Sequence, residues 1–234
     1  MNLTSRTLVV AAHPDDEVLG CGATMARISS EGGIVQTIFL ADGESSRFPI
    51  SEVGSKKVTE RILARRAAAK SAATILGNLP PKFYDLPDNR LDTVPMLEIA
   101  KIIETETALF KPSRVITHFS GDLNVDHQRV HEAVLVATRP QRDSSVREVI
   151  CFELPSSTEW RPPGSGQAFS PNLFVNVQSF ENKKFAALGA YETEMRAFPH
   201  PRSTEAILAL MKWRGASSNL ALAEAFFLLR AISL

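Results

Sequence analysis

Short apolar runs alternate along this chain with longer segments in which apolar residues recur at helical spacing. The first pattern is typical of buried strands and the second of amphipathic helices. The apolar runs predict strands at residues 8–12, 34–41, 82–86, 114–118, 149–154 and 172–177. The helical spacing predicts helices that begin near residue 18 and at 56–76, 93–110, 126–138, 180–194 and 203–213. Because strands that alternate with helices indicate right-handed βαβ crossovers, we expect an α/β fold: a Rossmann-like, mostly parallel sheet flanked by helices.

No linker divides the 234 residues, so a single domain over residues 1–234 is expected. Its core covers about residues 1–154, and about residues 155–234 form a C-terminal extension. The extension opens on a stretch rich in Pro, Gly and Ser that has no periodicity, residues 155–171. Loops of this length are usually either functional or mobile.

Composition and charge narrow the classes of partner. Hydrophobic residues make up 44% of the chain, and 26 Lys and Arg residues balance 26 Asp and Glu residues. Because the formal net charge is zero, neither nucleic acid nor an anionic membrane is favoured as a partner. The apolar run before His13 is too short for a signal peptide, and the apolar segment at 220–234 is too short to span a bilayer. Cys21 and Cys151 lack motif spacing and are expected as reduced core thiols, so a cytoplasmic protein is predicted.

Candidate chemistry gathers where the first strand ends, in the run His13-Pro14-Asp15-Asp16-Glu17. Acidic residues and Pro are ordinary in the first turn of a helix, so a purely structural role is the alternative. His13 directly before the acidic residues favours a site, because His13 and Asp16 are three apart and can converge on one cation. Asp15 must then point elsewhere. A ligating His and Asp beside a spare carboxylate suit a hydrolytic metal site, at the sheet edge where α/β proteins bind ligands.

The sequence Ala-His-Pro-Asp-Asp-Glu-Val-Leu-Gly-Cys-Gly at 12–22 closely resembles the opening motif of the LmbE-like (PIG-L-type) family of metal-dependent N-acetylglucosaminyl deacetylases. The resemblance continues through residues 121–127 and, more loosely, over nearly the whole chain. It implies a hydrolase that removes an N-acetyl group from a sugar, conjugate or lipid-linked sugar containing N-acetylglucosamine (GlcNAc). It also implies that the C-terminal extension packs near the active-site edge of the sheet.

The resemblance supplies a third metal ligand. In the family this ligand is the last His of a motif after the fourth strand, which here is His127. Two histidines, the Asp16 carboxylate and an open position suit a catalytic zinc site and equally an Fe²⁺ site. We therefore expect His13, Asp16 and His127 to bind Zn²⁺, with Fe²⁺ or another divalent metal left open. His131, four residues further on, could share the helix face of His127, but the interpretation as a solvated helix histidine is favoured.

The catalytic roles follow the family with one departure. Asp15 is expected as the general base. Many members carry a His at the position of Asn124, oriented by the acid that here is Asp126. An amide can hydrogen-bond an oxyanion but cannot deliver a proton as an imidazolium does. Either Asp15 serves as both base and acid, or His200 is recruited from the Phe-Pro-His-Pro-Arg stretch at 198–202; a loop histidine without a role is the alternative.

Expected substrate contacts are Arg65 and Asp88, which align with family residues that bind the substrate; both could equally be surface charges. Trp160 offers a stacking face for a sugar ring, with a packed loop aromatic as the alternative. The expected partner is an N-acetylated amino sugar. Aglycone, pathway and oligomeric state stay open, and a homo-oligomer is compatible with the sequence.

The sequence leaves three alternative functions to compare. An amidase or N-glycoside-cleaving enzyme would keep the site and change the bond that is cleaved. A metal-dependent sugar-binding protein without turnover is disfavoured by the retained Asp15, although Asn124 keeps it open. Dinucleotide binding is disfavoured because the third glycine of G-x-G-x-x-G is replaced by Met25, and because Gly20 and Gly22 follow the acidic turn.

Overall fold

The computed structural model describes residues 3–162 and 164–233. Residues 1–2, 163 and 234, which the predicted domain includes, lie outside the described residues. Within the described residues seven strands form one sheet of order β3-β2-β1-β4-β5-β7-β6. The strands are β1 (Arg6–Ala11), β2 (Ile34–Ala41), β3 (Lys82–Leu86), β4 (Arg114–His118), β5 (Glu148–Phe152), β6 (Leu173–Asn176) and β7 (Ala223–Ala231). Strands β1 to β5 run parallel, and β7 pairs antiparallel with both β5 and β6.

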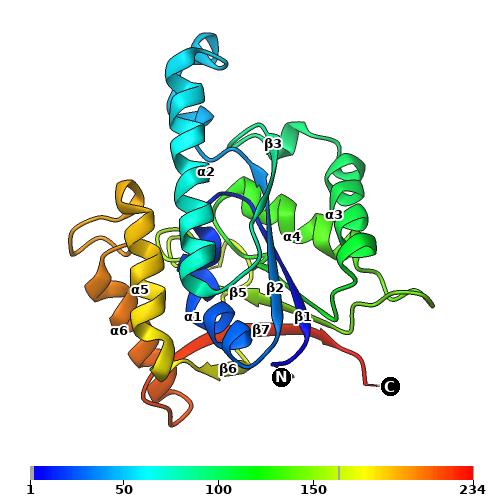
Figure 1. The fold of residues 1–234 in the computed structure, drawn as a ribbon, viewed down its shortest axis with the longest axis vertical. Helices are drawn as coiled ribbons and strands as arrows, with labels where there is room; N and C mark the ends of the chain where they lie inside the picture. The colour runs from blue at the N-terminus through cyan, green and yellow to red at the C-terminus, as the bar shows by residue number, and fades with distance from the viewer. Residues whose placement is uncertain (1–2, 163, 234) are drawn as a thin grey trace.

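Helices cover both faces of this sheet (Figure 1). They are α1 (Asp16–Ser30), α2 (Lys56–Leu76), α3 (Met96–Phe110), α4 (Val125–Ala137), α5 (Glu181–Ala190) and α6 (Thr204–Ala216). Helices α1, α2 and α5 pack together on one face, α6 lies against β6 and β7, and α3 and α4 pack on the other face. The predicted α/β fold, with a mostly parallel Rossmann-like sheet, is confirmed.

Strand β1 is a continuous apolar run because it lies between these two helical layers. Alternate side chains point to opposite faces of a strand. Val9 and Ala11 belong to the hydrophobic core on the side of α1, α2 and α5, whereas Leu8 and Val10 belong to the core under α3 and α4. A strand with both faces buried shows the unbroken pattern from which it was predicted.

The main differences from the sequence prediction are two helix boundaries and one strand. The helix predicted from residue 93 begins at Met96, after Pro95, whose fixed φ suits a helix start. The helix predicted over 180–194 ends at Ala190, and Glu192–Glu194 form a separate 3₁₀ turn. Strand β7 was not predicted: its residues pair with β5 and β6, which lie far away in the sequence, and no local pattern reports such partners. None of the described helices is long and apolar enough to cross a membrane.

The order of the strands in the sheet indicates where a ligand would bind. From β1 the sheet extends to β2 and β3 in one direction and to β4 and β5 in the other. In doubly wound sheets the crevice at such a switch point, outside the carboxyl ends of the strands, is where ligands bind. The turn from β1 into α1 and the segment from β4 into α4 both lie there. They carry the residues that the sequence analysis selected.

Candidate metal centre and active site

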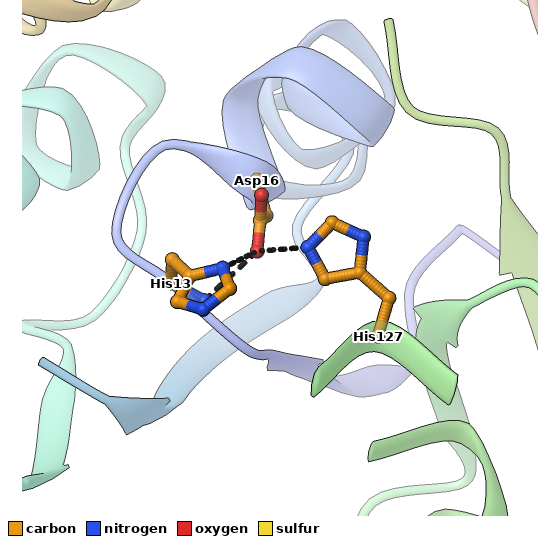
Figure 2. Close-up of side chains that lie close together, drawn as sticks. All are labelled: His13, Asp16 and His127. Carbon is orange, nitrogen blue, oxygen red and sulfur yellow. Dashed lines mark hydrogen bonds and ion pairs between the residues drawn. The ribbon is translucent and has the colours of Figure 1, made fainter. Parts of the chain in front are cut away.

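His13, Asp16 and His127 meet at this switch point (Figure 2). The carboxylate oxygen Oδ2 of Asp16 lies 3.3 Å from Nδ1 of His13 and 3.4 Å from Nε2 of His127. Figure 2 shows Asp16 at the start of α1, between His13 from the β1–α1 turn and His127 from α4. All three side chains are buried. One nitrogen of each ring and one carboxylate oxygen therefore face a common point.

The other nitrogen of each ring is held by a carboxylate. Nε2 of His13 lies 3.0 Å from Oδ2 of Asp126, and Nδ1 of His127 lies 3.0 Å from Oδ1 of Asp122. Metal-binding histidines in proteins characteristically donate their second N–H to such a partner, which fixes the tautomer and the ring orientation. This arrangement directs Nδ1 of His13 and Nε2 of His127 toward Asp16.

A divalent metal ion fits these three residues. Nε2 of His127 is buried and has no hydrogen-bond partner in the described part of the chain. A buried nitrogen without a partner is costly unless something else binds its lone pair. Two imidazoles and one carboxylate form a donor set suited to Zn²⁺ and also to Fe²⁺. The unpartnered nitrogen and the types of donor atom both indicate a divalent metal ion as the ligand of this site.

The charges of the metal-free site are strongly coupled. Burial by itself would lower the pKa of His127, but the carboxylates of Asp16 and Asp122 outweigh burial and raise this pKa to about 9. Burial would raise the pKa of Asp16, yet His127 and His13 hold it well below its ordinary value. The pKa of His13 is raised despite burial by hydrogen bonds with neighbouring carboxylates. A metal ion must therefore displace protons from this site.

Asp126 acts on His13 and not on the residue at 124. Besides His13 it accepts backbone N–H groups of Asn89 at 2.7 Å and of Leu91 at 2.9 Å. Asp88 also reaches Nε2 of His13, at 3.0 Å, and its carboxylate accepts the Ser46 hydroxyl at 2.5 Å. His13, Asp88 and Asp126 are close enough together to hold a second ion. These protein contacts already account for both carboxylates, so we interpret the pair as the support that orients His13.

Asp15 faces two arginine side chains, and not the group formed by His13, Asp16 and His127. Its carboxylate lies 2.8 Å from Nη1 of Arg202 and 3.3 Å from Nη2 of Arg65. Burial raises the pKa of Asp15, and the two guanidinium groups oppose that effect without cancelling it. The backbone of Asp15 has a φ of 130°, a region that non-glycine residues rarely occupy and that is often found at functional sites.

A cavity of about 120 Å³ opens over this arrangement. Six residues selected from the sequence line it: His13, Asp15, Arg65, Asp88, Asn124 and His127. Asp16 and Asp126 contact His13 from beneath. Arg65 and Asp88 are buried, which excludes the alternative that they are surface charges. The remaining lining includes Ser156, Ser157 and Arg202, none of which the sequence analysis selected.

Arg65, expected to contact the substrate, has its donors occupied by the protein. Nε donates to the carbonyl of Pro14 at 2.6 Å. Nη1 lies 3.2 Å from Glu44 and is also paired with Glu194, and Nη2 faces Asp15. The role that these contacts indicate is to support the β1–α1 turn and Asp15.

The side-chain amide of Asn124 makes hydrogen bonds to other residues of the protein. Its Oδ1 accepts the backbone N–H of Asp126 at 2.8 Å and thereby caps the first turn of α4. Its Nδ2 donates to Oδ1 of Asn89 at 3.0 Å. The amide oxygen is committed, and one N–H of the amide is left for a ligand.

His200 is not among the described residues that line the cavity. Its Nδ1 accepts the backbone N–H of Arg202 at 3.0 Å, and its ring lies edge-on to Trp160, with centroids 5.8 Å apart. The Phe-Pro-His-Pro-Arg stretch therefore does reach the site, through Arg202. The sequence therefore contained a signal for the site in this stretch, although the residue that reaches Asp15 is Arg202 and not the predicted His200.

The interpretation of His131 as a solvated histidine is wrong. It is buried, and its Nδ1 lies 2.9 Å from the backbone oxygen of His118 and 3.6 Å from Sγ of Cys151. The face of α4 that carries His131 packs on β4 and β5, which the spacing on α4 alone could not reveal. Cys21 and Cys151 are buried free thiols, as predicted.

A Rossmann-like sheet that carries two histidines, an aspartate and a spare carboxylate at its switch point is the arrangement of a metal-dependent hydrolase. The chain belongs to the PIG-L family: the family model described as GlcNAc-PI de-N-acetylase matches residues 8–138. The predicted family and its deacetylase class of enzyme are confirmed.

Two relatives cover most of this chain. The uncharacterized deacetylase YaiS of Escherichia coli is 27% identical over 194 residues, which is 80% of this chain and 90% of that protein. A probable N-acetyl-α-D-glucosaminyl L-malate deacetylase 2 of Bacillus cereus is 24% identical over 212 residues, 88% of this chain and 92% of that protein.

Solved structures share the fold at lower identity. N,N′-diacetylchitobiose deacetylase of Pyrococcus horikoshii superposes with a TM-score of 0.76 at 17% identity, over 97% of this chain and 84% of that one. GalB, the 4-carboxy-2-hydroxymuconate hydratase of Pseudomonas putida, superposes with a TM-score of 0.71 at 23% identity, over 98% of both chains. The fold is thus common to deacetylases and a hydratase, so the reaction has to be argued from the site.

Proposed function

We propose that this chain is a zinc-dependent hydrolase that removes the N-acetyl group from a GlcNAc-containing conjugate. One observation carries the proposal: Nε2 of His127, which has no hydrogen-bond partner in the described residues, and the carboxylate of Asp15, which faces two arginines, border the same polar cavity. The first provides a place for the metal, and the second a base beside it.

The chemistry divides between metal and protein. When bound, a divalent metal supplies a Lewis acid and a water molecule of lowered pKa. Asp15 accepts a proton from the attacking water as the water oxygen bonds to the acetyl carbon. The same carboxyl then returns the proton to the sugar nitrogen as the C–N bond breaks, releasing acetate and a free amine. Asn124 cannot act as the acid, because an amide has no proton to give at neutral pH.

The shape of the site favours a conjugate over free GlcNAc. A second cavity of about 440 Å³ adjoins the first and shares Ser46, Asp88 and Asn89 with it. The small polar cavity accommodates the acetamide and part of the sugar, and the larger one is available to the remainder. We propose that Asp88, which lines both cavities, borders the sugar while it orients His13.

The test is product analysis with a panel of substrates. Metal-depleted protein is reconstituted with Zn²⁺ or Fe²⁺ and offered GlcNAc, N,N′-diacetylchitobiose and an aryl glycoside of GlcNAc. Acetate and free amine should appear in equal amounts, only with metal, and fastest with the conjugates. A glycosylamine of GlcNAc, added to the panel, tests the N-glycoside alternative: release of its reducing sugar without acetate would instead identify an N-glycoside-cleaving enzyme. Metal-dependent binding of the panel without any product would identify a sugar-binding protein.

A further inference from the structure

The two guanidinium groups beside Asp15 contact the same carboxylate oxygen. Nη1 of Arg202, at 2.8 Å, and Nη2 of Arg65, at 3.3 Å, both face Oδ2. No hydrogen bond within the described residues reaches Oδ1, and Asp15 lines the cavity. One oxygen of the carboxylate is thus anchored by two positive charges, and the other is left for a ligand.

Arg202 is itself held firmly. Its Nε donates to Oγ of Ser156 at 2.7 Å, and its backbone N–H donates to Nδ1 of His200 at 3.0 Å. Its Nη1 also lies 3.4 Å from Oε2 of Glu194. The next residue, Ser203, caps α6. The guanidinium therefore stands at a fixed place, and a planar charged group loses little entropy when it is fixed in this way.

We propose that Arg202 is a positioning residue for Asp15, a role that rests on the proposed function. By anchoring Oδ2, it keeps the carboxylate from rotating about its Cβ–Cγ bond and commits Oδ1 to the attacking water. Oδ1 takes the proton as the water oxygen bonds to the acetyl carbon, and gives it to the amine nitrogen as the C–N bond breaks. Holding a reacting group at the correct angle is worth orders of magnitude in rate.

Arg202 is better suited to this role than Arg65. Arg65 also binds the Pro14 carbonyl, Glu44 and Glu194, so it supports the turn as a whole. Arg202 makes the shorter contact and lines the cavity from the segment before α6. The C-terminal extension consequently completes a site whose metal ligands all precede residue 128.

The experiment compares Arg202→Ala and Arg202→Lys with Arg61→Ala. Arg61 belongs to the same ionic network, 3.4 Å from Glu44, but is half exposed and does not touch Asp15. Each variant is assayed for metal content, thermal midpoint, kcat and KM. Arg202→Ala should retain its metal and fold and lose about 100-fold in kcat, with KM changed by less than about threefold. Arg61→Ala should match the wild type.

Chemical rescue sharpens the result. Added guanidinium should raise the kcat of Arg202→Ala by at least about tenfold. It should not change the kcat of Arg202→Lys, because the lysine side chain fills the site. A kcat of Arg202→Ala within about threefold of the wild type, or a loss confined to KM, would overturn the proposal. So would a loss in kcat that guanidinium leaves unchanged.

A structural readout separates this proposal from the proposed function. Crystal structures of the wild type and of Arg202→Ala need no substrate. The Asp15 carboxylate should keep one orientation in the wild type and rotate, or take two orientations, in the variant. An unmoved carboxylate would contradict the positioning role even if the enzyme is a deacetylase. If the wild type releases no acetate from any substrate, the proposed function fails while this structural comparison still decides what Arg202 does to Asp15.

Discussion

The imidazole rings of His118 and His127 stack face to face, with planes 14° apart and centroids separated by 4.0 Å. His118 ends β4 and is fully buried. Burial and the neighbouring His127 hold the pKa of His118 well below its ordinary value, so the ring is neutral. Its Nε2 accepts the backbone N–H of Ala12 at 2.9 Å. A neutral ring fixed to β1 thus forms a flat support for a metal ligand.

We expect His118→Ala to weaken metal binding. The substitution removes the surface on which His127 rests and leaves the N–H of Ala12 without its acceptor. Loss of a group that orients a metal ligand typically costs 10- to 100-fold in affinity. The lost packing and the orphaned N–H should lower the free energy of unfolding by about 2–4 kcal/mol. Metal titration and urea denaturation measure the two effects, and an unchanged affinity would show that the stack does not support His127.

Substitution of a proposed metal ligand should reduce metal binding more strongly than His118→Ala does. We expect one divalent ion per chain, and no retained ion in His13→Ala or His127→Ala, because two of three protein ligands cannot hold it at micromolar metal. His131→Ala serves as the control: it removes a buried histidine from the same helix but no ligand, and should retain the ion. Elemental analysis after dialysis gives the answer. Full occupancy in His127→Ala would mean that the third ligand has been misassigned.

Asp15→Asn should separate metal binding from turnover. The amide keeps the size of the side chain but cannot accept a proton, so kcat should fall about 100-fold or more while the metal is retained. Glu104→Gln neutralises a carboxylate paired with Lys101 on α3, away from the site, and should leave kcat unchanged. Near-normal turnover of Asp15→Asn with metal bound would exclude Asp15 as the base.

Features that depend on interactions between residues close in the sequence could be predicted, and features that depend on distant residues could not. Strand β1 and the His13–Asp16 spacing could be interpreted because a buried strand and a metal-binding turn leave their pattern within a few residues. Lys184 and Glu224 could not: they form a buried pair 2.6 Å apart across forty residues. On the sequence they resemble surface charges.

Arg202 could not be predicted as a site residue for the same physical reason: its interactions are not local in the sequence. A charged residue in a proline-rich loop looks solvated unless its partner is known, and its partner Asp15 lies 187 residues earlier. The family resemblance directed attention to histidines, because a missing imidazole had to be replaced. The structure instead has the Arg202 guanidinium beside the carboxylate of Asp15, the residue that we propose as the base.

Metal affinity should depend on pH in a defined direction. The metal needs the unprotonated Nε2 of His127, whose pKa in the metal-free protein is about 9. Below that pH the ion must displace this proton, which raises affinity about tenfold per pH unit up to about pH 9. His13, whose pKa is also raised, releases a second proton, so where both rings are protonated the rise should approach about a hundredfold per pH unit. Calorimetric titration in buffers of different ionisation enthalpy counts the protons released, and a count of zero at pH 7 would contradict the charge state described for the site.

The same groups set the stability of the metal-free protein. The folded pKa of His127, about 9, exceeds its ordinary value of 6.5, so its contribution to stability is fully present below about pH 6.5. That contribution is lost as the pH rises through 9. The unfolding midpoint of metal-free protein should therefore fall over this interval, and that of metal-loaded protein should not follow. Asp122→Asn removes one of the two carboxylates that raise the pKa of His127, and should move the decline to lower pH. A decline at the same pH in Asp122→Asn and the wild type would show that a group other than His127 is titrating.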